Sequence, residues 1–266
     1  MRRAGAVFVL LVVALAVATV SAGVADRVGA TFALMADDFV KAFKPLEGLV
    51  AAVEGDMLFL DLGEGNGVQA GQEFTVFRIG ESFHHPITGR QLGRYEDILG
   101  YAHVKRVERA FSEASFVPIP DKAAPRAEDG VRITRGRIKV AVTPALDLTN
   151  GQADVRRVPY LIATVLERSK RFQVVDPLAV TDMFASGTLR VEEVLARPDR
   201  ATRIARNLEV TGWVVPVLLE RRGVIYLDVT WISAITGMPL FSRRQALLPG
   251  GTAEEQRFPW EPRVED

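Results

Sequence analysis

A chain of 266 residues that is 48% hydrophobic can bury one large core or two modest ones. Its 33 basic and 33 acidic residues cancel, so no overall field favours nucleic acid or an anionic membrane surface as a partner. The absence of cysteine excludes disulfides, thiolate metal sites, a cysteine nucleophile and acylation of an N-terminal lipoprotein cysteine.

The first residues, "MRRAGAVFVLLVVALAVATVSAGVADR", have the layout of a secretory signal: two arginines, an apolar run and then small residues. They predict a signal peptide over residues 1–22 with cleavage after Ala22, and Ala25 offers a second cleavage site. An uncleaved anchor is the alternative, because about 20 apolar residues can span a bilayer. We expect a periplasmic location for a Gram-negative protein, with a mature chain that does not span a membrane.

Residues 23–45 predict an amphipathic helix that Pro45 stops. Large apolar residues recur at spacings of three and four on one side of it: Val28, Phe32, Met35, Phe39 and Phe43. This face could bind a partner or lie on a membrane surface. We expect it instead to pack on the first domain of the chain itself.

Residues 46–135 predict a small β-barrel or sandwich. From Leu46 the apolar period changes to two, as in "MLFLDLG" and "QEFTVFRI", which is the period of half-buried strands. The link "GEGNGVQAG" is rich in glycine and asparagine, which tight turns favour. Short strands closed by such turns are typical of a small barrel.

The stretch "GESFHHPITGRQLGRYED" lies between a strand expected to end near Ile79 and one expected to begin near Leu99. Its proline and glycines predict a long hairpin connection from Gly80 to Asp97. Loops on a rigid barrel commonly carry recognition. We therefore predict a partner-binding surface at Arg90, Arg94 and Tyr95.

The same stretch holds the adjacent pair His84 and His85, and His103 follows on the next strand. With a carboxylate from Glu81, Glu96 or Asp97, the three histidines would make a metal-dependent enzyme, which is the alternative hypothesis. Consecutive residues of a strand point to opposite faces, however, so the pair could not easily share one ion. We predict that no metal site is present.

Residues 136–249 predict a mixed α/β domain with helices packed on a sheet. The order is a strand, a helix, a short strand, further helices and a closing three-stranded meander, and residues 250–266 read as a disordered tail. Asp199 is the expected cap of one helix. Pro216 cannot donate to a ladder, so its strand is expected at an edge or a bulge. The fold class is therefore α+β, with the β-domain first.

No catalytic motif is present in the chain. There is no phosphate-binding glycine loop, no "GxSxG" elbow and no "HExxH" spacing, and paired carboxylates are adjacent in sequence, as on a solvated helix edge. We therefore predict a protein that is not an enzyme, with no catalytic residues and no cofactor.

Two segments resemble known envelope proteins. "YLIATVLERSKRFQVVDP" and "ATRIARNLEVTGWVVPVLLERRGVIYLDVTWISAITGMPLFSRR" resemble the α/β domain shared by the TolB N-terminal region, the curli-secretion lipoprotein CsgG and the middle domain of the flagellar outer-membrane-ring protein FlgT. "GEGNGVQAGQEFTVFR", "HPITGRQLG" and "EDGVRI" resemble the small β-domain of FlgT, with the domain order reversed.

The resemblance implies a non-enzymatic periplasmic scaffold or assembly factor at the outer membrane, in flagellar or secretion-apparatus assembly. Its partner would be an envelope protein complex and not nucleic acid. The sequence leaves the oligomeric state open. We expect partner contact through the Gly80–Asp97 connection and the helix from Val28 to Phe43, because Pro216 and the charged pair Arg243 and Arg244 blunt the expected sheet edges.

Overall fold

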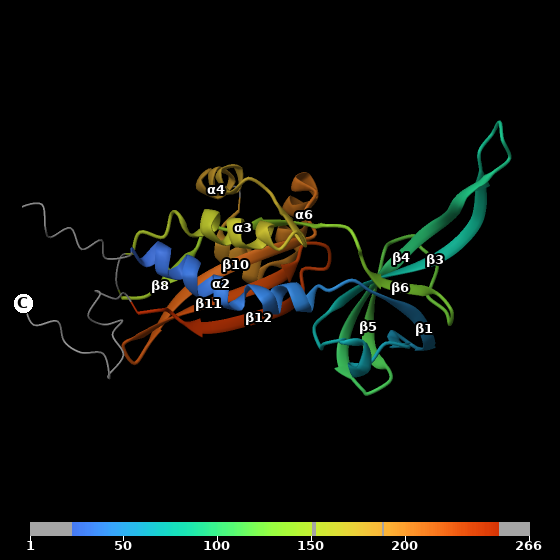
Figure 1. The fold of residues 1–266 in the computed structure, drawn as a ribbon, viewed down its shortest axis with the longest axis horizontal. Helices are drawn as coiled ribbons and strands as arrows, with labels where there is room; N and C mark the ends of the chain where they lie inside the picture. Colours follow the sequence, from blue (N-terminus) through green and yellow to red (C-terminus); the bar gives the residue numbers. More distant parts are fainter. Residues whose placement is uncertain (1–22, 151–152, 188, 250–266) are drawn as a thin grey trace, which may run out of the picture.

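The fold is that of a computed structural model, which describes residues 23–150, 153–187 and 189–249. The expected signal peptide and C-terminal tail lie outside the described residues. A β-barrel and a layer of helices on a sheet lie next to each other along the long axis of the molecule, and a two-stranded hairpin projects from the barrel (Figure 1). The expected α+β class is confirmed.

The barrel contains six antiparallel strands in the order β1-β2-β5-β4-β3-β6, closed by pairing of β1 with β6. Alternate residues such as Leu58, Leu60, Phe74 and Val76 are fully buried, as the period of two predicts. A short 3₁₀ helix, Glu64–Asn66, follows β2. The strands are β1 (Leu46–Glu54), β2 (Met57–Leu60), β3 (Glu73–His84), β4 (Gln91–Val107), β5 (Ser112–Pro118) and β6 (Gly130–Ile133).

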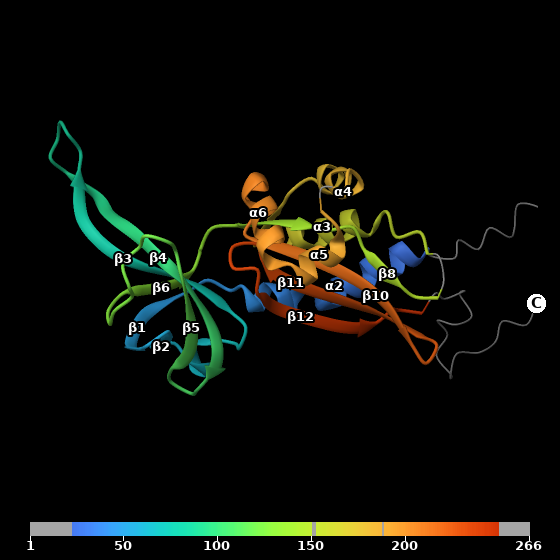
Figure 2. The same cartoon turned by 180° about the vertical axis from the view of Figure 1, so that it is seen from behind.

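The second sheet has the order β12-β11-β10-β7-β9, and β8 pairs with β10 beside β7. Helices lie on both of its faces (Figure 2). Its strands are β7 (Ile138–Val142), β8 (Leu146–Leu148), β9 (Phe172–Val174), β10 (Gly212–Arg221), β11 (Val224–Ser233) and β12 (Pro239–Ala246). Its helices are α2 (Val24–Ala42), α3 (Val158–Arg168), α4 (Pro177–Ala185), α5 (Val191–Ala196) and α6 (Pro198–Leu208).

The first helix, α2, packs on this second sheet, so the expectation that it packs on the first domain is wrong. Phe32 and Phe39 are fully buried in a core shared with α3, β7, β11 and β12. The Arg27 side chain donates to the carbonyl of Leu248 at 2.6 Å, and Arg243 of β12 pairs with Asp38. The barrel is therefore an insertion between α2 and β7, and the apolar face of α2 is not free for a partner.

Two local predictions for the second sheet are also wrong. The strand with Pro216 is central, not at an edge, because β10 pairs with β11 along its whole length. On its other side β10 pairs with β7 at Gly212–Val214 and with β8 at Val217–Leu219, so Pro216 falls in the break between two partners and its missing N–H leaves no ladder bond unmade. Asp199 lies in the first turn of α6, whose N-cap is Arg197.

Candidate functional site

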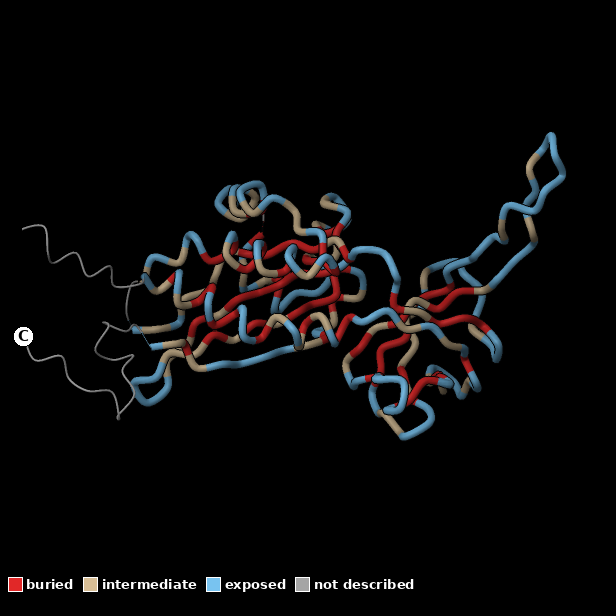
Figure 3. The backbone as a smooth tube through the Cα atoms, in the orientation of Figure 1, coloured by how far each residue is buried: buried red, intermediate tan, exposed pale blue. Residues whose placement is uncertain are grey.

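The hairpin of β3 and β4 is the most prominent feature of the surface. β6 pairs with β3 only at Thr75–Phe77, and β5 pairs with β4 only at Gly100–Val107. Beyond these positions the two strands pair only with each other. From Arg78 to His84 the ribbon extends roughly 20 Å past the barrel at about 3.3 Å per residue, and most of it is exposed (Figure 3).

The long connection expected from Gly80 to Asp97 is therefore mostly strand. Only residues 85–90 form the turn, which the backbone bonds His85 N–H to Arg90 O (2.8 Å) and Gly89 N–H to His85 O (2.9 Å) close. The His85 ring caps the turn, since its Nδ1 accepts the N–H groups of Ile87 and Thr88 at 3.2 Å each. These bonds give His85 a structural role in the turn.

The structure does not bring the three histidines together. His84 pairs with Gln91 at the far end of the hairpin, whereas His103 pairs with Glu73 at its base. Glu73 and His84 are eleven positions apart in β3, which is roughly 35 Å at about 3.3 Å per residue. No group of three or more histidines and carboxylates in the described part of the chain could hold a metal ion. The alternative hypothesis of a metal-dependent enzyme therefore lacks the cluster of histidine ligands on which it depended.

The predicted partner-binding residues lie on the distal part of this hairpin. Tyr95 is 63% exposed, and its ring packs at 5.0 Å from that of Phe83. Arg94 lies opposite Ser82 in the ladder, and Arg90 ends the turn. Neither arginine forms an ion pair with a described residue. Sequence reasoning missed Phe83, because its partnership with Tyr95 depends on a register that irregularities in the ladder shift.

The carboxylates at the base of the hairpin are neutralised by the barrel. Glu96 accepts two hydrogen bonds from Arg132, one at 2.9 Å, and this contact lowers the pKa of Glu96. Asp97 accepts from Lys122 at 2.5 Å. The charged side chains of the hairpin that form no ion pair with a described residue are Glu81, Arg90 and Arg94, so the excess charge there is basic.

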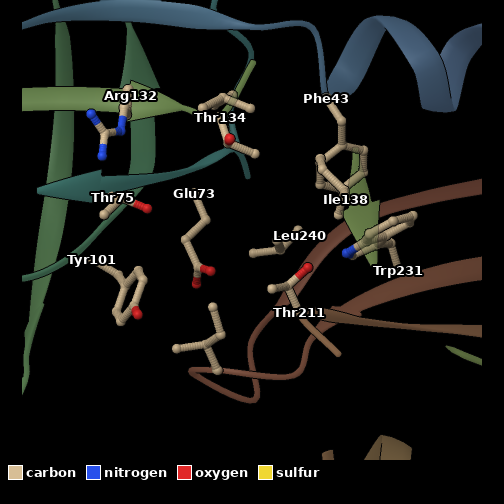
Figure 4. Close-up of a pocket in the computed structure, with 12 residues that line it drawn as sticks. Phe43, Glu73, Thr75, Tyr101, Arg132, Thr134, Ile138, Thr211, Trp231 and Leu240 are labelled. Atoms are coloured by element: carbon tan, nitrogen blue, oxygen red, sulfur yellow. The ribbon is translucent and has the colours of Figure 1, made fainter. Parts of the chain in front are cut away.

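A second candidate site lies where the barrel meets the α/β layer. A cavity of about 110 Å³ is bordered by barrel residues on one side and by the second sheet on the other (Figure 4). Glu73 of the barrel faces into it and accepts from Thr236 Oγ1 at 2.6 Å and from Ser233 Oγ at 2.9 Å. Burial raises the pKa of Glu73, and these two hydrogen bonds oppose the rise.

The junction is built to hold the two parts together. Arg171 is 8% exposed and forms no ion pair with a carboxylate of the described residues. Its guanidinium donates to the carbonyls of Phe43 (2.7 Å), Thr134 (2.7 Å) and Gly136 (2.5 Å). These carbonyls belong to the two segments that cross between the barrel and the α/β layer. Gly71 (φ +90°) leaves space for the Leu240 carbonyl, which would lie 2.3 Å from an added Cβ. The cavity has room for only a few water molecules, and we interpret it as part of the packing between the barrel and the α/β layer.

Comparison with known proteins gives limited matches. No family model matches the chain, and no curated protein sequence does. The C-terminal domain of LpoB from Salmonella enterica is 16% identical, with a TM-score of 0.37 over 44% of this chain and 86% of that one. The same domain from Escherichia coli is 16% identical, with a TM-score of 0.36 over 44% and 86%. Lipoprotein GNA1162 from Neisseria meningitidis is 13% identical, with a TM-score of 0.34 over 42% and 81%.

These findings correct the resemblance drawn from the sequence. The assignment to FlgT and to the CsgG and TolB N-terminal family is wrong: no family model matches, and the solved structures that match include LpoB and GNA1162. The predicted roles in flagellar and secretion-apparatus assembly depended on that resemblance, and they are withdrawn with it. Among the described helices, none combines the length and apolar character that crossing a bilayer requires.

Proposed function

We propose that this chain is a non-enzymatic interaction protein of the cell envelope, a scaffold or assembly factor that binds an envelope protein complex through the distal half of the β3–β4 hairpin. Arg90, Arg94 and Tyr95 are the residues we assign to that contact. The observation that carries the proposal is a ribbon that leaves the barrel, buries little of itself and presents exposed apolar and unpaired basic side chains.

The barrel has no need of this extension for its own stability. The barrel is already closed at the positions where β3 pairs with β6 and β4 pairs with β5, and none of its buried core residues lies in the projecting part of the hairpin. An isolated two-stranded ribbon is marginal in water, and exposed apolar groups with open strand edges invite aggregation. A ribbon with these costs is best explained by a contact that covers it.

The direction of the ribbon supports the same role. The N-terminal end of α2 lies at the opposite end of the long axis from the tip of the hairpin (Figures 1 and 2). The residues before α2 have the composition of a signal or an anchor. If that segment is retained as an anchor, which is the alternative to cleavage after Ala22, the chain would present the hairpin on the side far from the membrane, where a second envelope component can meet it.

Co-purification from envelope fractions tests the proposal. We expect the full chain to retain an envelope protein partner, and a variant with residues 82–95 replaced by an Asn-Gly turn to lose it. A variant changed at the exposed β10–β11 turn, Arg222→Ala, serves as the control and should keep the partner. Recovery of the native protein only from cytosol, with Arg2 and Arg3 still attached, would overturn the proposal.

A further inference from the structure

The distal ribbon, residues 82–95, has two chemically different faces. Alternate residues of a strand point to opposite sides. On one side Phe83 lies across Gly93, where an added Cβ would stand 2.9 Å from the ring, and the same ring packs against Tyr95. On the other side Ser82 and Arg94 lie opposite each other in the ladder. The ribbon is therefore aromatic on one face, and the other face is polar and basic except for Leu92, which lies two residues before Arg94 and is 47% exposed.

The aromatic face is pre-formed. Glycine at position 93 lets the Phe83 ring lie directly on the backbone of the neighbouring strand, and Tyr95 holds it from the side. Tyr95 remains 63% exposed and Phe83 36% exposed. Aromatic side chains and arginine are the groups that protein interfaces enrich at their centres, and a side chain already ordered loses little entropy on binding.

The tip adds one apolar group and one more cation. Ile87 is 88% exposed at the apex of the turn that His85 caps, and Arg90 closes that turn. Between Ser82 and Tyr95 the sequence contains no aspartate or glutamate. Opposite charges across an interface steer association and fix its register, so the surface that receives this tip should be acidic.

We propose that the distal ribbon inserts into a groove of a folded protein partner, with carboxylates facing Arg90 and Arg94 and an apolar wall covering Phe83 and Tyr95. This inference rests on the proposed function and specifies the chemistry of its partner. The ribbon would enter lengthwise, with Ile87 in an apolar pocket at the closed end of the groove.

Two other occupants fit the ribbon less well. Membrane docking favours a broad apolar face. The exposed apolar residues of this ribbon, Phe83, Ile87, Leu92 and Tyr95, are divided between its tip and its two faces, and they alternate with polar and basic residues such as Gln91 and Arg94. A symmetric pairing of the ribbons of two copies would place Arg90 and Arg94 of both copies near each other, and like charges oppose such pairing. A protein groove with acidic walls satisfies both faces at once.

Photo-crosslinking identifies what covers the tip. The full-length protein is expressed in its own cells with p-benzoylphenylalanine in place of Ile87, and a control carries it in place of Leu34, which is 64% exposed on α2. We expect a protein adduct from position 87 that position 34 does not give. The adduct supports the inference only if the cross-linked peptide lies in a groove that contains carboxylates.

Affinity measurements with the purified partner then test the charges. The double change Arg90→Glu and Arg94→Glu should weaken binding at least tenfold and flatten its salt dependence, because it replaces attraction by repulsion. Reversing the mapped carboxylates of the partner to lysine should restore part of the loss. The matched control, Arg221→Glu with Arg222→Glu, reverses two exposed arginines at the opposite end of the sheet and should leave affinity unchanged.

Several outcomes would overturn the inference. They are no adduct at position 87, an adduct of lipid mass with binding to vesicles of phosphatidylglycerol and phosphatidylethanolamine, an adduct with a second copy of the chain, or unchanged affinity on charge reversal. If the shortened hairpin loses the partner while charge reversal does not weaken it, only this inference fails. If the shortened hairpin keeps the partner, the proposed function fails as well.

Discussion

Arg171 should fix the barrel relative to the α/β layer, and its removal tests that account of the junction. Its guanidinium donates to three carbonyls on the two segments that cross between the parts: Phe43, Thr134 and Gly136. Burial lowers the pKa of Arg171, because the charge is moved out of water. The three carbonyl dipoles stabilise the buried charge, and the side chain connects the two crossing segments; we call this arrangement the Arg171 clamp.

The change Arg171→Met keeps an unbranched apolar stem, shorter than that of arginine, and removes all three donors. A hydrogen bond from a charged donor contributes about 1.5–3 kcal/mol, and the cost of desolvating the guanidinium offsets part of the sum. The variant also leaves carbonyls without a partner. We expect a net loss of about 3 kcal/mol in the free energy of unfolding, or about 6–12 °C in Tm for a chain of this size.

Calorimetry and spin-label distances between the barrel and the α/β layer measure the two consequences. The variant should unfold at lower temperature and show a broader distance distribution. Arg171→Lys is the control for charge: it keeps the cation but cannot reach three carbonyls with a planar fork, so it should fall between the wild type and Arg171→Met. A Tm within about 2 °C of the wild type, with an unchanged distance distribution, would refute the clamp.

Three further predictions concern the same architecture. Phe32→Ala should lower the free energy of unfolding by about 3–5 kcal/mol. It should also raise hydrogen exchange in β11 more than in β4, because Phe32 is buried in the α/β core. Equal effects on both strands would contradict this packing. Gly71→Ala should destabilise the junction, because it adds a Cβ at 2.3 Å from the Leu240 carbonyl and at a positive φ; an unchanged Tm would show that the close approach is absent. Burial raises the pKa of Glu73 in the folded protein, so its contribution to stability is fully present below the pKa of the unfolded chain and is lost as the pH rises through the pKa of the folded protein. The free energy of unfolding of the wild type relative to Glu73→Gln should therefore fall from acid to neutral pH. A constant difference in Tm would exclude the effect.

The sequence predicted elements where burial is one-sided. The buried residues of β2, Leu58 and Leu60, alternate with half-buried ones, and the period of two identifies such a strand without knowledge of its partners. The face of α2 was predicted for the same reason. Its partner was not, because a helical stripe says which residues are buried and nothing about which part of the chain covers them. The insertion of a whole barrel between α2 and β7 leaves no local signal.

The strands of the distal hairpin could not be predicted from the sequence, because neither of their faces is buried. From Ile79 to Leu92 both faces of the ribbon are largely exposed, so no alternation of apolar and polar residues marks the strand, and its glycines and proline read as a loop. Composition alone located Arg90, Arg94 and Tyr95 in an exposed segment. The contact of Tyr95 with Phe83 and the distance from His84 to His103 depend on the cross-strand register, which the bulges of the ladder alter.

The distal hairpin is the part of the chain that we propose makes the contact with an envelope protein partner. The most direct measurement is the amount of partner that co-purifies from envelope fractions with the full chain and with the variant whose residues 82–95 are replaced by an Asn-Gly turn, after both show the same Tm. The account predicts that the shortened variant folds normally and brings down no partner. Equal recovery of the partner by both proteins would contradict it.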